Sequence, residues 1–316
     1  MRTLDLLLRF GAALTTTRGD PVGANRVQAS TLSRLFSAQV FRDFGRHGKS
    51  PLFSRLVGQS GLEEQLLPGG TVADAFDAAF SLLRRAGWRD EYVYRSALTQ
   101  KILLGRHSLN TATILNELRA GNSKADVVVL NGTASVYEIK SERDTLQRLT
   151  GQLNDYMRVF ASVNVVVSPA HVGPVLALAP ADVGVLVLTD RYTLRSERLA
   201  QERPERIDPM LVLDSLRVGE ALQVLSQFGI EVLDVPNTRI RAALRSHFLD
   251  LDPAATHAAM VATLRRTRSK SGLADFVRSV PNSLTAAALS VKVSQADQGR
   301  IRSAIDTPLK AALTWS

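Results

Sequence analysis

Residues 125–140 read ADVVVLNGTASVYEIK, and this stretch decides the fold. It contains two apolar segments of strand length, joined by a short polar turn. The first segment carries Asp126, and the second carries Glu138 and Lys140. A charge inside an apolar strand has to be paired or has to bind an ion, because an isolated buried carboxylate is very costly. The stretch therefore predicts two paired strands that carry a charged site.

The turn at Asn131-Gly132 is a typical hairpin signal, and its length sets which residues face each other. A two-residue turn sets Asp126 opposite Tyr137, with Glu138 on the other face of the sheet. A three-residue loop ending at Gly132 sets Asp126 opposite residue 136, with Glu138 as its diagonal neighbour. We predict the second register, because it is the one of the two that gathers the carboxylates.

Carboxylates and a lysine on adjacent strands suit Mg²⁺, a hard cation that takes oxygen ligands. We expect Asp126 and Glu138, together with the carbonyl of Ile139, to hold one or two Mg²⁺ ions that orient and activate water. Lys140 then positions the attacking water or stabilises developing negative charge. Glu117 on the preceding strand, or Glu91 on a helix, completes the metal shell.

A simpler alternative needs no metal. Charges on one sheet face can form ordinary ion pairs, here Glu138 with Lys140 and Asp126 with Lys124. For a single match to so short a pattern, that alternative is favoured. The order of elements around the stretch, described next, favours the metal site.

The chain of 316 residues is long enough for more than one domain. Residues 90–105 are expected to form a helix, followed by strands near 111–119, 125–130 and 135–140. A second helix near 144–160 and strands near 163–167 and 184–188 follow. The fold class is therefore α/β, and we expect strand 163–167 to join the same sheet in parallel after a helical crossover. We divide the chain into a helical N-terminal region (1–89), a core (90–200) and a helical C-terminal region (201–316).

Charge and composition restrict the partners. The net charge is +9 and favours a polyanion, nucleic acid being the simplest. The chain has no Cys, which excludes disulfides and Cys-based zinc sites and fits a cytoplasmic protein. Prolines or charged residues interrupt the apolar runs at 1–14 and 172–188. We therefore expect neither a targeting segment nor a membrane span.

Asp126, Glu138 and Lys140 together resemble the metal-binding and catalytic motif of the PD-(D/E)XK nuclease superfamily. The likeness covers about residues 90–190 and is strongest to the restriction-endonuclease-like and RecB-like members. It also extends to a bacterial and phage family of uncharacterised nuclease-like proteins. The resemblance implies a restriction-endonuclease-like αβββαβ core between mainly helical flanks. Ala125 stands where the motif often has proline.

Two further elements of the superfamily have counterparts here. Glu91 lies where members often carry an acidic residue on the first helix. Gln152 and Tyr156, four residues apart on the second helix, match the Q-x-x-x-Y element of RecB-like nucleases, which contacts DNA and supports the site. Packing of this helix on the sheet explains the same two residues equally well.

Basic residues outside the motif are candidates for contacts with phosphates. Arg148 flanks the second helix and is a candidate to line a groove, and Arg265 and Arg266 open the densest basic cluster of the C-terminal region. A solvated helix face is an equally good interpretation of that cluster. The five His have no metal-ligand spacing, and we assign them structural or surface roles.

Taken together, the sequence predicts a nuclease that uses Mg²⁺, with Mn²⁺ as a substitute, to hydrolyse phosphodiester bonds of DNA. DNA repair, restriction and phage–host conflict all suit it. The alternative is a catalytically inactive nuclease fold that binds DNA or protein, and an RNA nuclease is not separable from the first hypothesis. The helical flanks are expected to bind DNA, a second copy of the chain or another protein.

Overall fold

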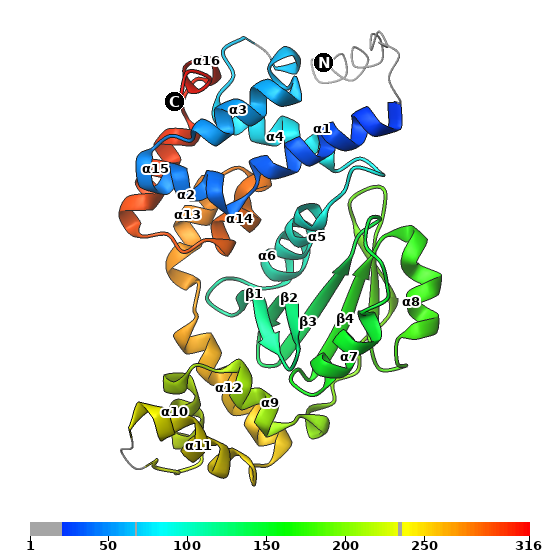
Figure 1. Cartoon of the computed structure of the whole chain (residues 1–316), viewed down its shortest axis with the longest axis vertical. Coiled ribbons are helices and arrows are strands. Elements are labelled where there is room, and N and C mark those ends of the chain that lie inside the picture. Colours follow the sequence, from blue (N-terminus) through cyan, green and yellow to red (C-terminus); the bar gives the residue numbers. More distant parts are fainter. Residues whose placement is uncertain (1–20, 67, 233–235) are drawn as a thin grey trace.

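The computed structural model describes residues 21–66, 68–232 and 236–316 (Figure 1). Residues 1–14, which were assessed above for a targeting segment, lie outside the described part. Within the described residues, no helix combines the length and the apolar character needed to cross a membrane.

The described residues form one six-stranded sheet in which neighbours in space are also neighbours in sequence. The strands are β1 Thr113–Ala120, β2 Ser123–Leu130, β3 Ala134–Lys140, β4 Ser162–Val167, β5 Gly184–Leu188 and β6 Leu194–Arg198. β1, β2 and β3 are antiparallel neighbours, β4 and β5 follow β3 in parallel, and β6 closes the edge antiparallel to β5. The mixed α/β class and the parallel pairing of β4 are thus confirmed.

Helices provide the parallel crossovers, as parallel pairing requires. α7 (Leu149–Met157) connects β3 to β4, and α8 (Val172–Leu178) connects β4 to β5. The prediction of a helix from residue 144 is wrong at its start. Asp144 Oδ2 accepts hydrogen bonds from the backbone N of Ser141 at 2.8 Å and from its Oγ at 2.6 Å, which closes a turn before the helix begins.

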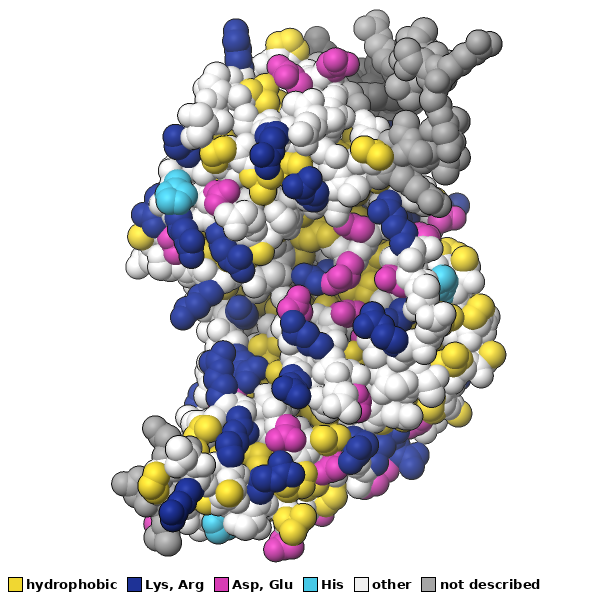
Figure 2. All heavy atoms as spheres, in the orientation of Figure 1, with side chains coloured by type: hydrophobic (Ala, Val, Ile, Leu, Met, Phe, Trp, Pro, Cys, Tyr) yellow, Lys and Arg dark blue, Asp and Glu magenta, His cyan; other side chains and the backbone are white. Residues whose placement is uncertain are grey.

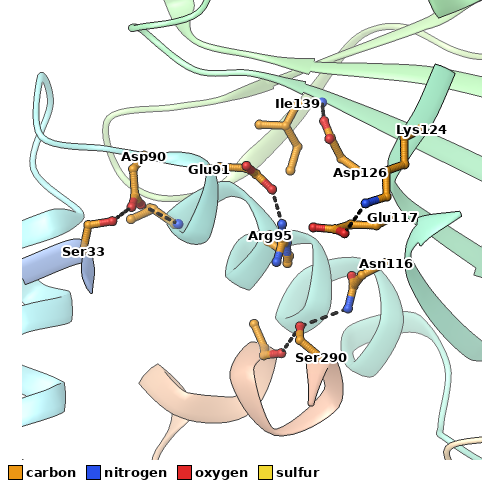
Figure 3. A network of polar contacts seen from close by, with 12 residues as sticks. Ser33, Asp90, Glu91, Arg95, Asn116, Glu117, Lys124, Asp126, Ile139 and Ser290 are labelled. Atoms are coloured by element: carbon orange, nitrogen blue, oxygen red, sulfur yellow. Dashed lines mark hydrogen bonds and ion pairs between the residues drawn. The ribbon is translucent and has the colours of Figure 1, made fainter. Parts of the chain in front are cut away.

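A continuous helical stretch precedes β1, as predicted for residues 90–105. It consists of α5 (Glu91–Leu98), a π-helical turn at Thr99–Leu103 and α6 (Leu104–Arg106). Asp90 caps its start by accepting a hydrogen bond from the backbone N of Val93 at 3.2 Å. This stretch lies over one face of the sheet (Figure 1), and Glu91 in its first turn lies on the side of the strands (Figure 3).

The remaining helices form two lobes. The terminal lobe combines both ends of the described chain: α1 Pro21–Leu35, α2 Ala38–His47, α3 Pro51–Ser60, α4 Val72–Leu83, α13 Ala274–Ser279, α14 Thr285–Ser290, α15 Gln295–Ile305 and α16 Leu309–Ala312. The α9–α12 lobe contains α9 Pro209–Ser215, α10 Val218–Ser226, α11 Asn237–Phe248 and α12 Pro253–Thr267. Figure 1 shows the terminal lobe above the sheet and the α9–α12 lobe below it.

The two faces of the sheet belong to two apolar cores. Val127, Val129 and Ile139 pack in the core that includes the terminal lobe. Val128 and Val136 pack in the core that includes α7 and the α9–α12 lobe. The region after residue 200 therefore contributes helices to both cores, and the division of the chain at 89 and 200 stays a prediction.

Candidate functional site

A cleft of about 850 Å³ opens beside the strands that carry the predicted site. Figure 2 shows acidic side chains in the hollow at the middle of the molecule, with Lys and Arg on both sides. The charged and amide-bearing residues that line it are Glu91, Glu117, Asn122, Lys124, Asp126, Glu138, Lys140, Asp144, Gln147, Arg148, Gln152, Asn154 and Asp155.

The β2–β3 register brings the two carboxylates closer than predicted. Val127 pairs with Tyr137, so continuing the ladder by one residue sets Asp126 directly opposite Glu138. Both registers considered above are therefore wrong, including the preferred one with Asp126 opposite Val136.

The reason lies in the hairpin loop. The three-residue loop was correctly expected, but it spans residues 131–133 and pairs Leu130 with Ala134. Asp126 lies four residues before Leu130, and Glu138 lies four residues after Ala134. The two acids are therefore directly opposite each other on neighbouring strands.

Asp126 lies where β2 and β3 separate. The paired residues end at Val127 and Tyr137. Beyond them, Asp126 Oδ2 accepts a hydrogen bond from the backbone N of Ile139 at 2.8 Å, as Figure 3 shows. Its side chain thus replaces a backbone partner, and among the described residues Oδ1 has no hydrogen bond. One carboxylate oxygen of Asp126 remains available to a ligand.

Glu138 is almost completely buried, with 2% of its side chain exposed. Its Oε1 accepts from Lys140 Nζ at 2.6 Å and from Gln152 Nε2 at 2.5 Å. The hydroxyl of Tyr156 lies 2.7 Å from Oε2 and also 2.9 Å from the carbonyl oxygen of Lys124. These partners stabilise a charge that would otherwise be costly to bury.

Residues from β3 and α7 thus meet at one point. Lys140 Nζ also donates to Gln152 Oε1 at 3.0 Å, so Gln152 bridges the acid and the base. An ammonium carries three protons, and two of those on Lys140 have partners. Among the residues that the structure describes, the third has no acceptor, so it can donate to a molecule in the cleft.

Electrostatics at this point favour a cation. Burial, with the negative charge of Glu138 as a second cause, raises the pKa of Asp126 to about 7. Burial also raises the pKa of the Tyr156 hydroxyl, with the charge of Glu138 again contributing, so Tyr156 remains a hydrogen-bond donor. Lys140 contacts Glu138, and acidic residues outnumber Lys and Arg in the cleft lining, so the cleft carries an excess of negative charge.

Glu91 and Glu117 line the same cleft but have other partners. Glu117 Oε2 lies 2.6 Å from Lys124 Nζ, and both side chains are more than half exposed. This hydrogen bond holds the pKa of Glu117 below its usual range. Glu91 pairs with Arg95 one helical turn later. Lys124 therefore pairs with Glu117, not with Asp126 as in the ion-pair alternative.

Arg95 also belongs to this site, although it was not predicted from the sequence. In Figure 3 its guanidinium lies between Glu91 and Glu117, on the side of α5 that faces the strands. The spacing of Glu91 and Arg95, four residues apart on a helix, was the available signal. Glu117 also has a left-handed backbone with φ of 57°, which no pattern in the sequence indicated.

Of the three arginines predicted to contact phosphates, one lies at the cleft and two lie elsewhere. Arg148 is exposed and lines the cleft. Arg265 donates to the carbonyl of Thr111 at 2.8 Å, and Arg266 donates to Gln223 Oε1 at 2.9 Å. These two arginines connect structural elements and do not line the cleft.

The donor set fits a magnesium ion. Across the described ranges, no three His, Asp or Glu side chains gather closely enough to form a metal site by themselves. Mg²⁺ commonly takes only one or two carboxylates and completes its shell with water and substrate phosphate oxygens. Asp126 offers Oδ1, and Glu138 Oε2 accepts one hydrogen bond at most and so keeps a lone pair. Both acids can therefore act as ligands without losing their present partners.

The residues that line the cleft lie within the part of the chain that a family model matches. The family model described as "Bacteriophage P4 protein cII" matches residues 84–290. Protein cII of Enterobacteria phage P4 is 32% identical over 126 residues, which are 39% of this chain and 48% of that protein. The chain thus spans about half the length of this curated relative. Among solved structures, a protein of unknown function from Silicibacter pomeroyi aligns with a TM-score of 0.27 and 22% identity, over 39% of this chain and 86% of its own.

Proposed function

The chain belongs to the bacteriophage P4 protein cII family, and we propose that it acts there as a metal-dependent nuclease that hydrolyses phosphodiester bonds of DNA. The observation that carries the proposal is the meeting of Asp126, Glu138 and Lys140 in one cleft. An ion pair that only stabilises the fold does not require an open cleft beside it.

The order of elements supports the same proposal. α5, β1, β2, β3, α7 and β4 follow one another as a restriction-endonuclease-like αβββαβ core does. Gln152 and Tyr156 on α7 both contact Glu138, as supporting residues of a RecB-like site should. We therefore propose that this core is of the PD-(D/E)XK type.

Asp126 and Glu138 are the residues that hold Mg²⁺ in this proposal, with Mn²⁺ as a substitute. When bound, such an ion would supply positive charge beside the scissile phosphate and would increase the acidity of the attacking water. Lys140 donates its third proton to the phosphate oxygen or orients the attacking water. Gln152 and Tyr156 hold the Glu138 side chain in place through their hydrogen bonds. In the overall reaction, water adds to phosphorus, one P–O bond breaks and the departing oxygen takes a proton.

A catalytically inactive nuclease fold that binds DNA or protein is the competing function. In such a protein we expect a disrupted site, with Glu138 or Lys140 turned away from Asp126. The facing register and the 2.6 Å contact between Lys140 and Glu138 favour the enzyme.

The test compares the chain with an Asp126→Asn variant on circular and linear duplex DNA and on single-stranded DNA, in Mg²⁺, Mn²⁺ or EDTA. Asparagine keeps an acceptor for the N–H of Ile139 and removes the repulsion with Glu138. We therefore expect an unchanged or higher melting temperature in EDTA, together with a loss of metal-dependent cutting of about 100-fold or more. RNA substrates serve as a parallel arm.

A Lys140→Ala variant tests the second role. Removing one partner of a buried ion pair costs about 3 kcal/mol or more. A loss of cutting by this variant therefore counts only under conditions where the variant is as fully folded as the unaltered chain. A Lys310→Ala variant, with its exposed lysine on α16, serves as the matched control. DNA binding without cutting in any metal would establish the binding function instead, and cutting by Asp126→Asn at the original rate would overturn the metal site.

A further inference from the structure

A second hollow, of about 450 Å³, lies between the two lobes beside β1. We call it the waist groove and define it by Asn116, Arg217, Arg268, Lys270, Ser290 and Lys292. Arg268 and Lys270 come from the segment after α12, whereas Lys292 follows α14 in the terminal lobe. Figure 2 shows Lys and Arg side chains gathered along this narrow part of the molecule.

The positive charge of the waist groove is largely uncompensated. Arg268 makes a two-point contact with Glu220, at 2.7 and 2.6 Å. Within the described residues, Arg217, Lys270 and Lys292 have no ion-pair partner, and no acidic residue is part of the groove lining. Burial lowers the pKa of Lys270, as expected for an ammonium partly removed from water without a counterion.

The neutral wall of the groove also offers polar atoms. Asn116 Nδ2 donates to Ser290 Oγ at 2.9 Å, which connects β1 to the terminal lobe (Figure 3). The Oδ1 atom of Asn116 is buried without a partner in the described residues. Backbone phosphates need such surroundings, since cations supply affinity and neutral polar groups fix position.

The waist groove adjoins the carboxylate cleft. Asn116 lines the groove and its neighbour in β1, Glu117, lines the cleft. In the other direction, Lys292 and Ser290 also line a hollow that contains Arg42 and Arg46 of α2. A basic surface therefore runs from the terminal lobe, through the waist groove, to the cleft.

We propose that the waist groove binds the phosphodiester backbone of the nucleic acid that is cut in the cleft. The inference rests on the proposed nuclease function and adds the surface that holds the substrate outside the reacting bond. The proposed contacts are to phosphates, which are the same in every sequence, so the binding is independent of sequence.

The experiment measures the affinity for a labelled duplex by fluorescence anisotropy over a range of salt concentrations in EDTA, where no cutting occurs. The groove variant is Lys270→Ala/Lys292→Ala. The control, Arg55→Ala/Lys310→Ala, removes two exposed charges from α3 and α16, far from the waist (Figure 1). Each lost phosphate contact lowers the slope of log affinity against log salt by about 0.9. We expect a slope lower by about 1.8 and binding weaker on the order of tenfold in the groove variant, with neither change in the control.

The outcomes separate the two proposals. Equal slopes for the groove variant and the unaltered chain would overturn the groove while leaving the nuclease intact if DNA is still cut in Mg²⁺. A lower slope in a protein that binds DNA but never cuts it would keep the groove and remove the nuclease. Absence of DNA binding by the unaltered chain would overturn the groove, and would direct attention to an acidic protein partner.

Discussion

Single side chains illustrate how this chain stabilises buried polar groups. Glu138 has three side-chain partners, so its buried charge is satisfied. His257 on α12 is also buried, but it is accommodated as a neutral side chain. It is 4% exposed, and its Nε2 accepts a hydrogen bond from the backbone N of Ala161 at 3.3 Å. This role requires a neutral ring, and within the described part of the chain no acid forms an ion pair with it.

His257 makes stability depend on pH. Burial lowers its pKa from 6.5 to about 4. The unfolded chain therefore binds a proton below about pH 6.5, whereas the folded chain does not until about pH 4, so this contribution to stability is complete above pH 6.5 and is lost as the pH falls. At about 1.4 kcal/mol per pKa unit, the loss is on the order of 3 kcal/mol.

Urea unfolding of the unaltered chain and of His257→Gln at pH 7.5 and pH 4 measures this loss. The glutamine can still accept from the N–H of Ala161 but does not titrate. Between pH 7.5 and pH 4, we expect the free energy of unfolding to fall more in the unaltered chain than in His257→Gln, by on the order of 3 kcal/mol. The same fall in both proteins would show that the ring does not cause it.

At the scale of elements, the pattern of apolar runs predicted β1 to β5, α5 and α7 because each has a buried face. β6 was missed, since its residues are mostly exposed and polar. The site was predicted as a set, with Asp126, Glu138, Lys140, Gln152 and Tyr156 brought together. The register was not, because loop length alone does not define which three residues form the loop. The separation of β2 and β3 depends on a side-chain contact that no periodicity contains.

The β1–β2 hairpin behind the cleft depends on Gly121. Its φ of 58° is left-handed, and a Cβ atom there would lie 2.8 Å from Asp155 Oδ1. Asp155 cannot turn away freely, because its Oδ2 accepts from Ser123 Oγ at 2.6 Å. We expect Gly121→Ala to destabilise the protein by about 2 kcal/mol or more, from backbone strain and the lost contact together.

Gly48→Ala separates the two causes. Gly48 has a similar φ of 68° but nothing within 4 Å of an added Cβ atom. We expect Gly48→Ala to cost about 1 kcal/mol from strain alone. Urea midpoints for both variants provide the comparison. Equal losses would mean that Asp155 moves without cost.

At the scale of the molecule, the sequence indicated helical flanks but not that they join. Thr71 and Pro308 form an isolated β-bridge, and the backbone N of Leu309 donates to the carbonyl of Gly70 at 2.8 Å. Trp315 packs against Phe44 at a ring distance of 5.8 Å. Such contacts between distant segments leave no local pattern, so neither the terminal lobe nor the waist groove could be predicted from spacing.

Arg89 connects the terminal lobe to the sheet. It is fully buried, and its guanidinium donates to the carbonyls of Leu188, Thr189 and Asp190 at 3.1, 2.9 and 2.9 Å. Its Nε also donates to the carbonyl of Arg84, at the end of α4, at 2.8 Å. One planar guanidinium thus satisfies carbonyls from the end of β5, from the turn after it and from the terminal lobe, a geometry that lysine cannot reproduce.

Removing this fork should therefore weaken the whole molecule. Arg89→Met keeps the apolar volume but leaves buried carbonyls without a donor, at about 1–3 kcal/mol each where water cannot enter. We expect a loss of about 3 kcal/mol or more in the free energy of unfolding, and Arg89→Lys should restore less than half of it. Arg85→Met, at an exposed position four residues earlier, should change stability by less than about 0.5 kcal/mol. If Arg89→Met proved as mild as Arg85→Met, the lobe would be held to the sheet by its apolar contacts alone.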